Sequence, residues 1–193
     1  MGTNTIRRLA LDGVLMALFL VLGMVRVRAG FVEIGFGTIV ITLAALALSP
    51  IDALLIGGIG EFISQVFFSG YGLTPTTPLW VLPVALRGLF LGLIALIYKR
   101  KGDTITKHIV PCFLSIMGVA LFISGLDTGI LYLDGLIMNY PVSYTAAQTI
   151  IRFATSQLNA IICGILVIPL YKAVMFMLPN EEVKSGGKET EEE

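Results

Sequence analysis

The stretch LWVLPVALRGLFLGLIALIY, residues 79–98, decides the fold of this chain. Its only charged side chain is Arg87, and Lys99, Arg100 and Lys101 follow it directly. About 20 apolar residues in an α-helix cross the hydrocarbon core of a bilayer, and basic residues collect at the membrane surface. The stretch therefore predicts a transmembrane helix.

Five further hydrophobic segments surround this stretch. Their predicted bounds are 9–25, 35–48, 51–68, 109–133 and 146–178, with a tight turn at Ser49 and Pro50. Of the 193 residues, 56% are hydrophobic and 13% are charged, and the mean hydropathy is +0.90. A water-soluble domain cannot bury that much apolar surface. The sequence predicts an all-α integral membrane protein with six transmembrane helices in one domain, 9–178.

The basic residues in the short connections predict the orientation. Arg7 and Arg8 precede the first segment, and four basic residues follow the fourth within 99–107. The connections on the opposite side contain Arg26 and Arg28 but no lysine. Because cytoplasmic loops retain positive charge during insertion, we predict that both termini are cytoplasmic.

The two ends of the chain carry separate predictions. Residues 1–8 form a short cytoplasmic N-terminus, and residues 179–193, which are polar and acidic, form a disordered cytoplasmic tail. A cleaved signal peptide is an alternative for the N-terminus, since Val27-Arg28-Ala29 loosely resembles a cleavage site after an apolar stretch.

No pattern of an enzyme is present in the sequence. The segment Gly186-Gly187-Lys188-Glu189 lacks the upstream glycine and the Ser or Thr of a phosphate-binding loop. His108 is the only histidine and lies beside a basic connection, where a solvated role is expected rather than catalysis. We predict a chain without catalytic residues and without an ATPase site of its own.

The sequence also gives no reason to expect a metal or a cofactor. Cys112 and Cys163 fall in separate apolar segments without CxxC spacing. Asp127 and Asp134 are seven residues apart and Asp52 is remote, so no carboxylate cluster is expected. Basic and acidic residues balance at 13 each, which gives no support for a nucleic-acid partner.

Three ionisable side chains fall in the middle of hydrophobic segments: Glu61, Arg87 and Arg152. A charge at the bilayer centre costs about 2.5 to 3.5 kcal/mol on insertion scales, so each is a candidate functional residue. Gln65 follows Glu61 by one helical turn, and Trp80 precedes Arg87 by two turns on the same helix face. We predict that both faces contribute to a substrate site; the alternative for Trp80 is an aromatic belt at the membrane interface.

The sixth segment carries a polar stripe. Its members recur at helical spacing, and they are Gln148, Arg152, Thr155 or Ser156, and Asn159. Such a stripe on an apolar helix should face a cavity or another helix. We therefore add Gln148 and Asn159 to the predicted substrate-binding residues.

The buried charges have two interpretations. Glu61 can pair with Arg87 or with Arg152 to neutralise charge between helices. One carboxylate cannot satisfy two arginines, however, and a guanidinium matches the geometry of a carboxylate. The second interpretation is therefore a pocket for a carboxylate-bearing substrate, with Arg152 as the main counter-charge and Arg87 in support. Arg26 and Arg28 either add to this pocket or are solvated loop charges.

Two pairs of small residues are spaced for close helix packing. They are Gly13 with Ala17 on the first segment and Gly88 with Gly92 on the fourth. Either pair can serve a contact inside the molecule. The first pair can equally form a partner interface, where a helix of another subunit docks.

Residues 7–178 resemble the substrate-binding S component of an energy-coupling factor (ECF) vitamin transporter, particularly its folate and pantothenate binders. The resemblance includes six short spans with both ends inside and a loop similar to the family's substrate-covering loop. The residues that carry it are Gly13 and Ala17, the loop 27–37 with Ile34-Gly35-Phe36-Gly37, and, in the sixth segment, Arg152, Asn159 and residues 169–172.

The resemblance implies capture of a vitamin at the outer face of the plasma membrane of a prokaryote. It implies partners in the bilayer and the cytoplasm: a membrane coupling subunit and two ATPase subunits. By position, Arg26 and Arg28 would close over the substrate. The residues that would line the site are Gln65, Trp80, Arg87, Arg152 and Asn159. Residues 71–80 depart from the loop of folate binders, so the vitamin stays open.

Two rival functions remain at this point. A stand-alone secondary transporter would use Glu61 as a proton or ion coupler. A membrane scaffold without transport activity is the second rival.

Overall fold

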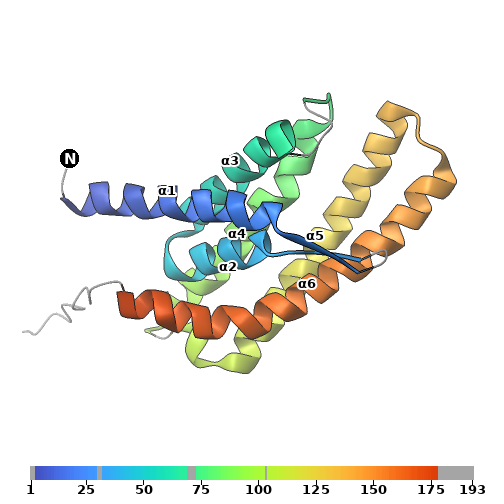
Figure 1. The fold of residues 1–193 in the computed structure, drawn as a ribbon. Coiled ribbons are helices and arrows are strands. Elements are labelled where there is room, and N and C mark those ends of the chain that lie inside the picture. The colour runs from blue at the N-terminus through green and yellow to red at the C-terminus, as the bar shows by residue number, and fades with distance from the viewer. Residues whose placement is uncertain (1–2, 30–31, 69–72, 103, 178–193) are drawn as a thin grey trace, which may run out of the picture.

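The computed structural model describes residues 3–29, 32–68, 73–102 and 104–177. In these ranges the chain forms six α-helices, one two-stranded sheet and one 3₁₀ turn (Figure 1). The helices are α1 (Thr3–Met24), α2 (Gly37–Ala47), α3 (Pro50–Phe68), α4 (Thr77–Arg100), α5 (Ile109–Met138) and α6 (Val142–Met177). The strands are β1 (Arg26–Ala29) and β2 (Val32–Gly35), and the 3₁₀ turn is η1 (Ile105–Lys107). The predicted tail at 179–193 lies outside the described residues.

The six helices follow the predicted segments, so the all-α class is confirmed. The bounds differ most for α1, which begins at Thr3 rather than at residue 9, and for α5, which ends at Met138 rather than at residue 133. Asn139, with φ 56°, adopts the left-handed conformation that closes a helix C-terminus. Polar residues near these ends are compatible with a helix even though they lie outside the apolar window.

Four helices are long and apolar enough to cross a membrane: α3, α4, α5 and the Val142–Ala173 part of α6. The apolar part of α1, Leu9–Met24, and the whole of α2 are shorter. The 11 residues of α2 span about 17 Å at 1.5 Å per residue. Nine of those residues are buried, so α2 is a central helix covered by its neighbours.

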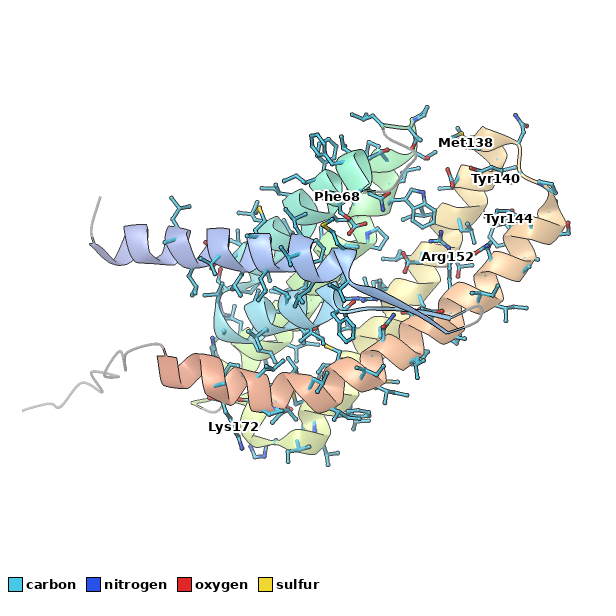
Figure 2. The ribbon with its side chains drawn as sticks, in the orientation of Figure 1. Phe68, Met138, Tyr140, Tyr144, Arg152 and Lys172 are labelled. Carbon is cyan, nitrogen blue, oxygen red and sulfur yellow. The ribbon has the colours of Figure 1, made fainter. Side chains whose placement is uncertain are left out.

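The helices pack in a bundle around α2. Helix α3 runs beside α4, α5 beside α6, and α2 contacts α1, α3, α4 and α6. The start of α1 and the end of α6 lie at one end of the molecule, and the turn between α5 and α6 lies at the other (Figure 1). At that turn Tyr140 and Tyr144 stack edge to face, with ring centroids 5.5 Å apart, whereas Lys172 lies toward the opposite end (Figure 2).

The hairpin of β1 and β2 stands where the sequence predicts only a loop. Its strands are antiparallel, with Arg26 opposite Gly35 and Ala29 opposite Val32. Residues 25–29 and 32–34 alternate apolar and charged side chains for much of their length, which is the two-residue period of a strand. Strand β2 contacts α6, so the hairpin lies over the helix that carries the polar stripe.

The two pairs of small residues have different surroundings. A Cβ on Gly88 would lie 2.6 Å from the Ala53 carbonyl oxygen, and one on Gly92 would lie 2.6 Å from Pro50 Cα. The pair on α4 therefore lets this helix approach α3 closely. On α1, by contrast, Gly13 and Ala17 are exposed, and a Cβ on Gly13 would meet no described atom within 4 Å. This pair therefore lies on the exposed surface of the described chain.

Candidate functional site

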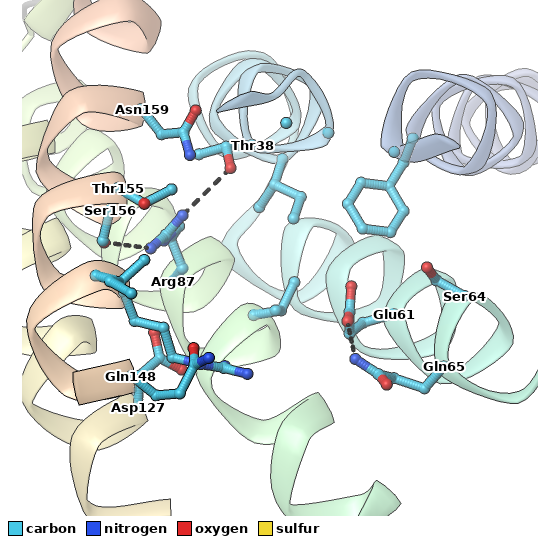
Figure 3. Close-up of a pocket in the computed structure, with 18 residues that line it drawn as sticks. Thr38, Glu61, Ser64, Gln65, Arg87, Asp127, Gln148, Thr155, Ser156 and Asn159 are labelled. Carbon is cyan, nitrogen blue, oxygen red and sulfur yellow. Dashed lines mark hydrogen bonds between the residues drawn. The ribbon is translucent and has the colours of Figure 1, made fainter. Parts of the chain in front are cut away.

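A cavity of about 610 Å³ opens among all six helices, near the hairpin (Figure 3). Its walls mix apolar residues such as Phe19, Ile41 and Val84 with many polar ones. The polar and charged residues are Thr38, Glu61, Ser64, Gln65, Arg87, Asp127, Gln148, Arg152, Thr155, Ser156 and Asn159. Pockets for small organic ligands combine apolar walls with a few polar groups in this way.

Six of the nine predicted substrate-binding residues line this cavity. They are Glu61, Gln65, Arg87, Gln148, Arg152 and Asn159. The polar stripe of α6 faces the cavity because its members share one side of the helix. The side chains of Arg26 and Arg28 lie outside the described part of the chain, although β1 itself is described. Whether these residues bind substrate stays a prediction.

Trp80 is not among the lining residues, but it packs against Arg152, which lines the cavity. The Cζ atom of Arg152 lies 4.4 Å from the centroid of the Trp80 ring. This is the geometry of a cation–π interaction between an arginine and an indole face. Arg152 is exposed at the cavity mouth, so the stack holds its guanidinium in position without burying it.

Arg87 lies deeper and is held by two hydroxyl groups. Its Nη1 donates to Thr38 Oγ1 at 3.3 Å, and its Nη2 donates to Ser156 Oγ at 3.5 Å. Both distances are at the long end for hydrogen bonds. The Nε atom is buried and has no hydrogen-bond partner among the described residues. These contacts use two of the five N–H donors of the guanidinium, and Arg87 is itself a lining residue of the cavity.

Glu61 lies across the cavity from Arg87 (Figure 3). Gln65 donates from Nε2 to Glu61 Oε1 at 2.7 Å, one helical turn further along α3. The predicted face of Glu61 and Gln65 thus forms one wall of the cavity. This arrangement does not favour a direct ion pair between Glu61 and Arg87, because the two side chains lie on opposite walls of the cavity (Figure 3).

Besides Ser64, the sequence analysis missed two polar lining residues that interact with the arginines. Asp127 on α5 was weighed there only as a metal ligand, although it falls within a hydrophobic segment. It lies in electrostatic range of both Arg87 and Arg152, and it gives the cavity two carboxylates and two arginines. Thr38 on α2 was the other omission. Its position on a short apolar helix was the signal, since few polar residues occur there.

The overall comparison with known proteins gives a family. The sequence model of the ECF-type riboflavin transporter S component matches residues 3–175. This chain belongs to that family. The resemblance stated from the sequence is therefore confirmed, and the protein is a transporter subunit rather than an enzyme. S components are integral membrane proteins that bind a substrate and work with a membrane coupling subunit and ATPases.

Solved structures show the same fold at low sequence identity. A crystal structure of FolT bound with folic acid is 20% identical, with a TM-score of 0.62 over 89% of this chain and 95% of that chain. The S component of a bacterial ECF transporter is 17% identical, with a TM-score of 0.65 over 91% and 99%. An S component for biotin is 16% identical, with a TM-score of 0.61 over 89% and 95%. No curated protein matches the chain.

Proposed function

We propose that this S component captures a small vitamin from outside the cell and releases it inward when docked on a coupling subunit with two ATPases. The observation that carries the proposal is the cavity with Arg87 in its wall. Among the described residues its Nη1 and Nη2 atoms make only one long hydrogen bond each, to hydroxyl groups, although each carries two protons. An acceptor group on a ligand would complete it.

The group that fits best is a carboxylate. An arginine fork and a carboxylate form two parallel hydrogen bonds, which are stronger when the charges are shielded from water. We assign the main role to Arg87 rather than Arg152, because Arg152 is exposed and water screens its charge more strongly. Folate and pantothenate are vitamins of this chemistry.

Asp127 supports a second candidate, an uncharged vitamin of the riboflavin class. The charge argument from the sequence counted one carboxylate against two arginines. With Asp127 the described lining balances two against two, so an uncharged ligand with carbonyl acceptors also fits. The name of the matching family points the same way.

Calorimetric titration of the purified chain separates these candidates. The ligands are folic acid, pantothenate, biotin and riboflavin, together with amide derivatives of the three acids. A carboxylate-specific site binds one acid at least tenfold more tightly than its amide, and Arg87→Gln reduces that affinity by roughly ten- to a hundredfold. Arg152→Lys should cost less. Arg100→Gln, at the exposed end of α4, is the matched control.

Tight binding of riboflavin alone would instead support the second candidate. Equal affinity of an acid and its amide, with no effect of Arg87→Gln, would exclude a role of this arginine in recognition.

We place both termini in the cytoplasm, in the plasma membrane of a prokaryote. The start of α1 and the end of α6 lie at the same end of the bundle (Figure 1). Lys99 donates to the Leu48 carbonyl oxygen at 3.4 Å, which ties the basic end of α4 to the end of α2. Lysine and arginine at one end of a bundle support a cytoplasmic location for that end.

Reconstitution tests the transport mechanism against the stand-alone alternative. In proteoliposomes, the chain alone should bind its vitamin but not accumulate it under a proton or sodium gradient. Uptake should require the coupling subunit, both ATPases and ATP. Gradient-driven uptake by the chain alone, lost in Glu61→Gln, would instead establish a secondary transporter.

A further inference from the structure

We infer that Ser124, which lies on α5 outside the cavity lining, is a positioning residue for Arg87. The inference rests on the proposed role of Arg87 in binding. Ser124 is 3% exposed and does not touch the cavity. Its Oγ donates to Ser156 Oγ on α6 at 2.9 Å, and Ser156 is one of the two residues that accept from Arg87. A connected chain of polar groups thus runs from the cavity into the helix interface.

The Ser124 hydroxyl holds the Ser156 oxygen by donating to it. Its proton is shared between two acceptors, the Ala120 carbonyl oxygen at 2.8 Å and Ser156 Oγ at 2.9 Å. Gln157 donates from Nε2 to Ser124 Oγ at 3.2 Å, which helps to fix the position of that oxygen. Ser156 Oγ therefore accepts from Ser124 on α5 and from Arg87 on α4, one donor for each lone pair.

The chain holds the Ser156 hydroxyl in one orientation. Without the Ser124 donor, the Ser156 oxygen would lose the bond that holds it from α5, and the side chain would rotate toward the backbone carbonyl one turn earlier on α6, which is the usual partner of a serine in a helix. Ser124 itself, Thr42 and Thr128 already make bonds of that kind. The Ser156 oxygen would then move away from Arg87, and the guanidinium would keep only Thr38 as a partner.

Chemical modification tests this inference without a ligand. Phenylglyoxal reacts with arginine, and mass spectrometry measures the rate at each site in the folded, purified chain. Ser124→Ala should raise the rate at Arg87 roughly fivefold, by the loss of about one hydrogen bond. The rate at Arg152 should stay constant, since Trp80 holds that side chain. In a Ser156→Ala background, Ser124→Ala should add nothing, because the chain is already broken.

Ser115→Ala is the matched control. Ser115 is on the same helix and bonds the Pro111 carbonyl oxygen at 2.7 Å, the same local bond that Ser124 makes. An unchanged rate at Arg87 in Ser124→Ala would overturn the inference. So would an equal rise at Arg87 and Arg152, because that result would show general loosening of the bundle.

Binding of folic acid and riboflavin then separates this inference from the proposed function. If Ser124→Ala raises the labelling rate and weakens binding several-fold, both stand. If the labelling rate rises but neither Ser124→Ala nor Arg87→Gln changes the affinity for either vitamin, the positioning role stands and the role of Arg87 in binding fails.

Discussion

At the scale of single residues, the same side-chain type has different surroundings in this protein. Arg152 is exposed and stacks on the indole ring of Trp80. Arg87 lies in the cavity wall and donates hydrogen bonds to two hydroxyl groups. Burial strengthens the interaction of a charge with a ligand because less water screens it. Substitution of Arg87 should therefore weaken ligand binding more than substitution of Arg152.

We predict that Trp80→Leu weakens vitamin binding about two- to fivefold. The reason is the loss of a cation–π contact worth about 0.5 to 1 kcal/mol at an exposed site, which lets Arg152 move. Calorimetry on Trp80→Leu, Arg152→Ala and the double variant measures the coupling. Tyr144→Leu, which changes an exposed aromatic residue at the same end of the bundle, is the control. Additive effects of the two substitutions would contradict a coupled pair.

At the scale of helices, the glycines separate internal packing from exposed surface. Helix α4 approaches α3 so closely that Gly88 and Gly92 leave no room for a methyl group. Helix α1 has the same spacing at Gly13 and Ala17, but these residues face outward beside exposed Val14 and Val21. Sequence spacing alone did not distinguish these two uses.

Gly88→Ala should destabilise the folded chain by about 1 to 3 kcal/mol, because the added Cβ would lie 2.6 Å from a backbone oxygen that cannot move freely. Thermal unfolding in detergent, followed by fluorescence of the single tryptophan, measures the change. Gly118→Ala on α5, an exposed glycine with no described atom within 4 Å of the new Cβ, should leave the melting temperature the same or raise it. Equal shifts in both variants would refute the close contact.

Gly13→Leu and Ala17→Leu should leave vitamin binding intact and abolish ATP-driven uptake. Bulky side chains on this outward face would hold the backbone of a partner helix away from α1. The measurements are calorimetry on the isolated chain and uptake in proteoliposomes with the full transporter. Gly118→Leu places the same side chain on an exposed position of α5 and should preserve uptake. Normal uptake by the α1 variants would remove this face from the partner interface.

At the scale of the whole molecule, the bundle has two chemically distinct ends. One end carries Lys172 near the end of α6, and the other carries the α5–α6 turn with Tyr140 and Tyr144 (Figure 2). Lys99 and Arg100 lie in the last turn of α4. Aromatic side chains and basic residues are both typical of membrane interfaces, but lysine and arginine favour the cytoplasmic one.

Cysteine labelling tests this orientation. In a background with Cys112→Ala and Cys163→Ala, Ser143→Cys should react with a membrane-impermeant maleimide in intact cells. Lys101→Cys should react only after the cells are opened. Both positions are exposed in the structure, so access is limited by the membrane alone. Labelling of both positions in intact cells would overturn the proposed sidedness.

Much of the candidate site follows from the sequence, because a charged side chain inside a bilayer has a high energetic cost and is usually functional or paired with another charge. This cost singles out Glu61, Arg87 and Arg152, and helical spacing adds Gln148 and Asn159. The same reasoning failed for Asp127, which is subject to the same cost but was judged only as a metal ligand. The sequence did not identify Ser124, because a serine in a helix can satisfy its hydroxyl by a hydrogen bond to the backbone carbonyl one turn earlier.

The sequence by itself determined that this chain is a bundle of hydrophobic helices with a polar face on the last one. The length and apolar content of each segment determine whether it can span the bilayer. The 3.6-residue period of the helix determines which residues share a face. The tertiary structure decided which faces meet. It brought Thr38, Asp127 and Ser156 to one arginine, and it buried one pair of small residues while exposing the other. Helix rotation and contact depend on packing between segments far apart in the chain, and no local pattern encodes them.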